Sequence, residues 1–152
     1  MESVQTTNYV LIRNCSYEEV AHFDTPEARK ETAHVYEGKT KHTWFCMELN
    51  GDIVGCSSLM PFSKREARLR GWYLMPQFRG QGLGVDLVRP VIGEAICEGY
   101  EYLESKTKHK GIMEALDFVF TGKEYPSWGG YRYVYKCKPD AVIPMEADES
   151  IN

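Results

Sequence analysis

Residues 69–96 read LRGWYLMPQFRGQGLGVDLVRPVIGEAI, and this stretch decides the fold. Its first part, Leu69 to Met75, is rich in residues that favour strands and ends at Pro76. The next part, Gln77 to Gly84, is rich in glycine and predicts a turn. Apolar side chains then recur at helical spacing as far as Ile96. The stretch therefore predicts a strand, a glycine loop and an amphipathic helix that begins inside the loop.

The loop sequence RGQGLG (residues 79–84) has the composition of an anion-binding turn. Glycines let the backbone approach a ligand closely, and the start of a helix leaves several NH groups unpaired and pointing the same way. A phosphate at this point also gains about 0.3–1 kcal/mol per charge from the helix dipole. A plain connection between strand and helix explains the glycines equally well, so the flanking sequence has to decide.

Two nucleotide-binding motifs do not match the loop. A P-loop needs Lys and then Ser or Thr after its last glycine, whereas Val85 and Asp86 follow Gly84. A dinucleotide-binding fingerprint needs glycines at its first, third and sixth positions, early in a βαβ unit. Here the glycines fall at positions 80, 82 and 84, late in the chain.

The rest of the chain supplies further strands and helices around this stretch. Ser16 and Glu19 have the spacing of a capping box, and Pro26 follows a potential N-cap residue. Pro90 lies inside the main helix, where it predicts a kink or a restart, and Gly99 predicts the helix end. The other predicted elements are a strand at 9–12, a helix from Ser16, a polar helix from Pro26 toward Tyr36 and Gly38, a hairpin of 43–49 and 53–60 joined by Asn50–Asp52, a strand at 100–106, an amphipathic helix at 112–120 and a strand at 131–137.

Composition limits the class of protein. The chain has 152 residues with a formal net charge of -4, which argues against nonspecific binding of nucleic acid. Its five cysteines are widely spaced and form no CxxC pair, so we expect neither a metal site nor a disulfide framework. Without a long apolar run or a signal segment, the sequence predicts a cytoplasmic protein with no membrane contact. We expect one domain over residues 1–140 and an acidic tail over 141–152.

The loop and its flanks resemble the GNAT superfamily of N-acetyltransferases. The acetyl-CoA motif of that family reads Arg or Gln, two variable residues, Gly, one variable residue, then Gly or Ala, and Arg79, Gly82 and Gly84 fit it. Tyr73 to Pro76 resemble the family's strand that splays open for the pantetheine arm. The resemblance covers nearly the whole chain. It implies an α/β fold with a central mixed, mostly antiparallel sheet of six to seven strands flanked by about four helices.

The resemblance implies acetyl-CoA as cosubstrate. The main chain of Leu74 and Met75 would pair with the pantetheine, and the NH groups of the loop would hold the pyrophosphate. The side chain of Arg79 would order the loop or meet a phosphate. The implied cofactor-binding residues are Leu74, Met75, Arg79, Gly80, Gln81, Gly82, Leu83 and Gly84.

The catalytic groups of the family are not matched. Gly71 stands where family members often carry a glutamate base, and the stretch expected to carry the tyrosine acid, Ala115 to Phe120, contains none. As replacements we predict Glu104 as base and Tyr125 as acid. The other candidates are Glu66, Glu101 and His109 for the base and Tyr131 for the acid. The segment Lys123–Gly130 is predicted to be a loop that shapes the acceptor site.

The leading functional interpretation is an N-acetyltransferase that moves the acetyl group of acetyl-CoA to a primary amine by direct attack in a ternary complex. The acceptor is a small molecule, a protein lysine or an N-terminus. A catalytically idle acyl-CoA-binding protein is an alternative, motivated by the missing glutamate and tyrosine. Another is an acyltransferase or toxin acting on aminoacyl-tRNA, suggested by Lys106, Lys108, His109 and Lys110. Family resemblance also suggests a homodimer.

Overall fold

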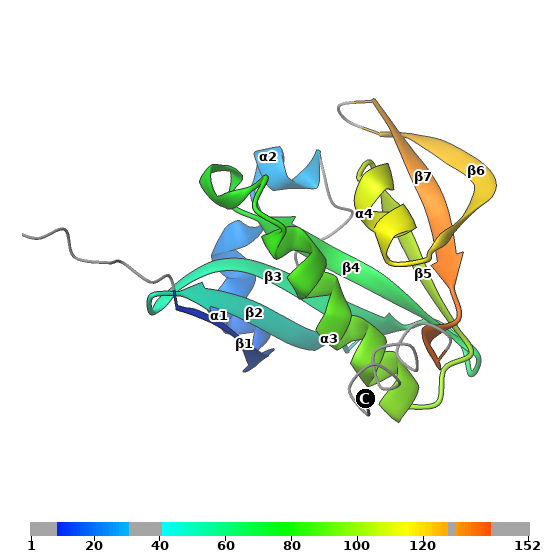
Figure 1. Cartoon of the computed structure of the whole chain (residues 1–152), viewed down its shortest axis with the longest axis horizontal. Helices are drawn as coiled ribbons and strands as arrows, with labels where there is room; N and C mark the ends of the chain where they lie inside the picture. Colours follow the sequence, from blue (N-terminus) through cyan, green and yellow to red (C-terminus); the bar gives the residue numbers. More distant parts are fainter. Residues whose placement is uncertain (1–8, 31–40, 128–129, 141–152) are drawn as a thin grey trace, which may run out of the picture.

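The computed structural model describes residues 9–30, 41–127 and 130–140. One seven-stranded sheet has the order β1-β2-β3-β4-β5-β7-β6, and all of its neighbouring strands are antiparallel except β4 and β5 (Figure 1). This confirms the predicted α/β architecture. The elements are β1 (Val10–Cys15), α1 (Tyr17–Val20), η1 (Ala21–Phe23), α2 (Pro26–Arg29), β2 (Thr43–Leu49), β3 (Asp52–Pro61), β4 (Glu66–Leu74), η2 (Pro76–Phe78), α3 (Leu83–Cys97), β5 (Tyr102–Thr107), α4 (Lys110–Ala115), β6 (Val119–Ser127) and β7 (Gly130–Cys137).

The helices cover both faces of the sheet. In Figure 1, α3 and α4 lie in front of the strands and α1 lies behind them. The larger core fills the space between α3 and the sheet, where Leu87, Val91 and Ile92 are fully buried at helical spacing. A smaller core under α1 and α2 contains Val20 and Trp44. We call the side of the sheet under α3 the α3 face and the opposite side the α1 face.

Several local signals act as the sequence predicts. Asn50 and Gly51 adopt φ angles of 54° and 93°, the left-handed conformations that a tight hairpin turn needs. The Thr25 hydroxyl accepts a hydrogen bond from the Ala28 NH at 3.1 Å and caps α2. The described part of that helix ends at Arg29, and its predicted continuation toward residue 38 lies outside the described residues.

The main helix, α3, is continuous through Pro90, so the predicted restart is not observed. One turn below the proline, the buried Ser57 hydroxyl donates a 2.7 Å hydrogen bond to the Leu87 carbonyl. At the other end, Gly99 has φ 82° and the Tyr100 NH bonds the Ala95 carbonyl at 3.0 Å. This pattern is a Schellman motif, which explains why the helix ends there.

Strand β4 contains a bulge and then separates from β5. The β3–β4 register shifts between Cys56 and Ser58, where Gly71 adopts φ 56°. The parallel pairing of β4 with β5 ends at Leu69 and Ser105, although both strands continue. Beyond that pair the two strands leave an opening, which we call the β4–β5 opening.

The C-terminal third differs from the prediction. The helix expected over residues 112–120 is α4, which ends at Ala115, because Asp117 turns the chain at φ 62°. Val119 and Phe120 belong instead to β6, a strand that the sequence analysis missed. Residues 123–127 of the expected 123–130 loop also lie in β6, and residues 128 and 129 lie outside the described part of the chain. Among the described helices, all are too short or too polar to cross a membrane.

Candidate active site

A cavity of about 310 Å³ lies on the α3 face at the C-terminal end of β4. It is bounded by the strand, by the glycine loop with the start of α3, and by the turn into α4. Its lining residues are Trp72, Tyr73, Leu74, Arg79, Gly80, Gly82, Gly84, Val85, His109 and Ile112. Five of the eight residues predicted to bind the cofactor therefore line one space, and Met75, Gln81 and Leu83 are not part of this lining.

The glycine loop has the backbone geometry of an anion cradle. Gly80 and Gly82 adopt φ angles of 84° and 82°, and Gly82 is the N-cap of α3. A side chain at either glycine would meet nothing within 4 Å but would strain the backbone, so the cradle is open and its conformation favours glycine. A Cβ on Gly84 would lie 3.4 Å from Ile112, in the wall of the cavity. The first NH groups of α3 point out of the helix start, where the dipole favours a negative charge.

Arg79 ties the loop to the end of β4. Its Nε donates a 2.8 Å hydrogen bond to the Leu74 carbonyl, and its guanidinium carbon lies 5.3 Å from the centroid of the Tyr73 ring. Of the two roles that the sequence left open for this side chain, the contact with Leu74 matches the ordering of the loop.

The main chain of Leu74 faces the β4–β5 opening, whereas that of Met75 faces β3. The Met75 NH donates to the Val54 carbonyl at 2.9 Å, and main-chain groups alternate sides along a strand. The Met75 carbonyl accepts a hydrogen bond from the Phe78 NH at 3.0 Å, so neither main-chain group of Met75 is left for the predicted pairing with pantetheine. Gln81 is exposed at the tip of the loop, and Leu83 is half-buried against the larger core.

Trp72 and His109 form one wall of the cavity. The sequence indicated His109 only as a candidate base and gave Trp72 no role. The Trp72 Nε1 donates to the Gly84 carbonyl at 3.1 Å, which joins the strand to the first turn of α3. The His109 ring meets Trp72 edge-on with centroids 5.3 Å apart. Their contact depends on tertiary structure, so no local sequence pattern indicates it.

A model of the Acetyltransferase (GNAT) family matches residues 9–117. The chain belongs to this family. No curated protein sequence matches the chain significantly. Among solved structures, the chain is similar to yncA, a putative acetyltransferase from Salmonella typhimurium solved with acetyl-CoA. The TM-score is 0.68 at 15% sequence identity, and the match covers 87% of this chain and 95% of that one.

Two further solved structures share the GNAT fold. One is a GNAT family acetyltransferase from Elizabethkingia anophelis with acetyl-CoA bound, with a TM-score of 0.65, 16% identity, and coverage of 85% of this chain and 97% of that one. The other is an N-acetyltransferase from Staphylococcus aureus Mu50, with a TM-score of 0.69, 16% identity, and coverage of 86% and 99%. At such low identity the similarity concerns the fold.

A second cavity, of about 520 Å³, lies on the α1 face of this GNAT domain. Phe23, Met75 and Phe78 give it a largely apolar wall, and Asp52 supplies a carboxylate at the end of the β2–β3 turn. Tyr73 lines both cavities, so the two spaces approach each other at the end of β4.

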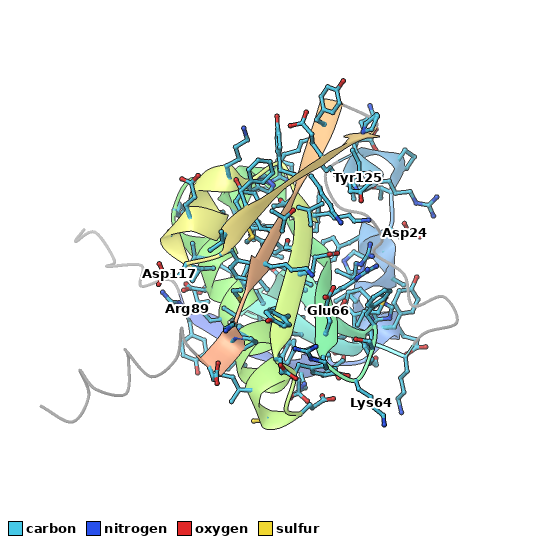
Figure 2. The ribbon with its side chains drawn as sticks, turned by 90° about the vertical axis from the view of Figure 1, so that its right-hand side faces the viewer. Asp24, Lys64, Glu66, Arg89, Asp117 and Tyr125 are labelled. Carbon is cyan, nitrogen blue, oxygen red and sulfur yellow. The ribbon has the colours of Figure 1, made fainter. Side chains whose placement is uncertain are left out.

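The predicted catalytic residues Glu104 and Tyr125 lie on the α1 face and outside the lining of both cavities. Glu104 is buried and its Oε1 is 3.3 Å from the Nε of Arg68. Tyr125 is 43% exposed on β6, and the Lys106 ammonium lies 4.6 Å from its ring centroid. In Figure 2, Tyr125 lies beside α2, and Glu66 lies toward the other end of the sheet. The catalytic roles stay predictions.

The other base candidates, Glu66, Glu101 and His109, also differ in whether they lie near the cavity. Glu66 is ion-paired with Lys136 at 3.0 Å, and the exposed Glu101 is paired with Arg65 at 2.8 Å. Only His109 of the named candidates lines the cavity beside the glycine loop. The GNAT glutamate position, Gly71, holds a left-handed backbone conformation, which gives a physical reason for glycine there. The helix α4, with sequence KGIMEA, carries no tyrosine.

Proposed function

We propose that this GNAT-family protein transfers the acetyl group of acetyl-CoA to a primary amine by direct attack in a ternary complex. The observation that carries the proposal is the cavity at the β4–β5 opening, closed on one side by the glycine cradle at the start of α3. The similar structures from Salmonella typhimurium and Elizabethkingia anophelis, both solved with acetyl-CoA, support this choice of donor.

Different residues of the cavity would contact different parts of acetyl-CoA. The NH groups of Gly82, Leu83 and Gly84 would hold the pyrophosphate, because they lie at the positive end of the α3 dipole. The NH of Leu74 would donate to an amide carbonyl of the pantetheine, because it faces the β4–β5 opening, whereas the Leu74 carbonyl already accepts from Arg79. Trp72 and Ile112 would exclude water from the thioester end, which strengthens the polar contacts made there.

The acceptor would approach from the α1 face through the β4–β5 opening, since the cofactor cavity occupies the α3 face. Its amine must be neutral to attack the thioester carbonyl; the carbon–sulfur bond then breaks, and the thiolate takes up a proton. His109 is the residue of the cofactor cavity best suited to exchange protons near neutral pH. The side chains of Glu104 and Tyr125 enter this proposal only as residues of the acceptor face.

The test of the donor site is calorimetric binding of acetyl-CoA to the parent protein and to Gly82→Trp, whose indole would fill the cradle. The matched control is Gly51→Trp, because Gly51 has a similar φ of 93° and equal open space but lies in the β2–β3 turn. We expect micromolar binding by the parent and the control, and its loss in Gly82→Trp. Absence of binding by the parent would refute the proposal.

Release of the CoA thiol in the presence of a panel of amines then tests the transfer step. Amine-dependent release by the parent supports acetyl transfer. Binding of acetyl-CoA without amine-dependent release would favour the idle acyl-CoA-binding protein instead.

A further inference from the structure

The α1 face carries a row of charged side chains on β4, β5 and β7. Arg68 and Arg70 alternate with buried residues along β4, and Glu104 and Lys106 lie beside them on β5. Because Lys106 is paired with Val134 in the β5–β7 register, Arg132, two residues away, projects from the same face. We call Lys106 and Arg132 the cationic patch.

The half of the row near the start of β4 is electrically balanced. Arg68 lies 3.3 Å from Glu104 and 3.8 Å from Glu66, and Lys136 lies 3.0 Å from Glu66. Two carboxylates therefore face two cations at this end. Such pairing is the usual arrangement for charged groups that are partly buried.

The cationic patch is not balanced in this way. Across the described residues, no ion pair joins Lys106 or Arg132 to a carboxylate. Arg132 is only 8% exposed; one of its terminal nitrogens donates to the Arg29 carbonyl at 2.6 Å, and its Nε has no hydrogen-bond partner in the described part of the chain. Lys106 is half-buried and lies over the ring of Tyr125.

The charges of the patch act on one another. Burial lowers the pKa of Lys106, and the neighbouring Arg70 lowers it further, with smaller effects from Arg68 and Arg132 that Glu104 opposes. Burial also lowers the pKa of Arg132. Gathering like charges in a half-buried place destabilises the folded state unless an anion compensates them.

The patch flanks the β4–β5 opening. Arg70 and Lys106 are the first residues of their strands beyond the last parallel pair, Leu69 and Ser105. On the α3 face, Trp72 and His109 line the cofactor cavity farther along the same two segments. An acceptor that enters the opening from the α1 face therefore passes beside the cationic patch before its amine reaches the cofactor cavity.

We propose that the acceptor is a small amine carrying one anionic group, a carboxylate or a phosphate, which Lys106 and Arg132 bind beside the β4–β5 opening. This inference rests on the proposed acetyl transfer and adds the substrate class. The recessed position of Arg132 suits a single compact anion more than the extended backbone of an RNA, whose binding the net charge of -4 also opposes.

A binding experiment tests the patch without turnover. The CoA-loaded protein is titrated calorimetrically with matched pairs that differ by the anion: phenylalanine and phenethylamine, β-alanine and ethylamine, phosphoethanolamine and ethanolamine. We expect about 10- to 100-fold tighter binding of the anionic member of at least one pair, the range for one or two charge-assisted hydrogen bonds. The carboxylate and phosphate pairs distinguish the two anions. Equal binding within every pair, or no binding by any member, would overturn the inference.

Variants locate the anion site. Lys106→Met is expected to reduce the preference within the pair at least about 10-fold while the affinities for CoA and for the uncharged member stay unchanged. Arg132→Gln provides a second, independent loss of the same preference. Lys123→Met is the control, because this exposed lysine lies on β6 outside the patch. A preference that persists in both Lys106→Met and Arg132→Gln would refute the assignment.

A turnover experiment separates this inference from the proposed function. Release of the CoA thiol is followed with each pair and with an aminoacyl-RNA. Faster transfer to the anionic members supports both proposals, and equal transfer to both members refutes only the anion site. Preference for the aminoacyl-RNA over the free amino acid also refutes the small acceptor. Anion-dependent binding without transfer to any amine refutes the acetyl transfer and leaves the anion site supported.

Discussion

Removal of the Arg79 side chain tests whether this residue braces the glycine loop before any ligand binds. In Arg79→Met the aliphatic stem remains, but the 2.8 Å hydrogen bond to the Leu74 carbonyl and the contact over Tyr73 are lost. A hydrogen bond from a charged group contributes about 1.5–3 kcal/mol, and we take the lower end because the contact is only partly buried. The cation–π contact adds about 0.5 kcal/mol. The expected loss of unfolding free energy is therefore about 2 kcal/mol.

Thermal unfolding of the ligand-free protein is the assay for this loss. For a chain of this size, 1 kcal/mol corresponds to about 2–4 °C in Tm, so we expect a decrease of about 4–8 °C. Arg65→Met is the control, because Arg65 forms an equally short ion pair with Glu101 while its side chain is 66% exposed. Exposed ion pairs contribute little, and we expect no measurable change in its Tm. An unchanged Tm in Arg79→Met, with weakened acetyl-CoA binding, would refute the brace and assign Arg79 to direct contact with a phosphate.

Two further predictions concern the strand bulge and the capping of α1. Gly71→Ala should lower the unfolding free energy by about 1–2 kcal/mol, because alanine is strained at φ 56°. Equal denaturant midpoints for the parent and Gly71→Ala would contradict this. The hydrogen bond from Arg13, and then that from the Ser16 NH, lower the pKa of Glu19 from 4.5 to about 2. The ionised carboxylate therefore stabilises the fold above pH 4.5. This contribution is lost as the pH falls toward 2. Glu19→Gln should therefore lower Tm at pH 7 but not near pH 2, and an equal difference at both pH values would show that ionisation is irrelevant.

The elements with strong start and stop signals could be predicted from the sequence. Asn50 and Gly51 define the β2–β3 hairpin, and Gly99 ends α3 in a Schellman motif, because each position needs a left-handed backbone that these residues tolerate. The glycine loop was located for the same reason. Local chain chemistry determines these features, so one sequence is enough to find them.

The missed strand, β6, has the opposite properties. Gly122, with φ 90°, and Pro126 interrupt its pattern, and its register shifts between Phe120 and Glu124. Proline and a bulge are tolerated because β6 is an edge strand, and that position follows only from the sheet order. The end of α4 was also hard to predict, because Asp117 adopts the left-handed conformation there and aspartate is a weaker stop signal than glycine.

The partners and positions of the side chains at the site could be found only from the tertiary structure. Glu104 was named as a base from its charge, yet it is ion-paired with Arg68 on the neighbouring strand. Trp72 and His109 carried no pattern, but the fold brings their rings together in the cofactor cavity. Periodicity predicts which side of a strand a residue occupies, whereas its partners depend on strand order.

The β4–β5 opening follows from two features of the sequence that act together. If the parallel pairing continued by one residue, Arg70 would lie beside Lys106, and like charges on neighbouring strands disfavour that pair. One residue further, Gly71 takes a left-handed conformation and the bulge turns β4 away from the regular ladder. The NH of Leu74 on the side of the opening is thereby left for a ligand on the α3 face, and the cations that oppose the pairing, Arg70 and Lys106, are left on the α1 face. The separation of the strands thus places the cavity beside the glycine loop and the cationic patch on opposite sides of a single gap, and the proposed transfer between two bound molecules needs such an arrangement.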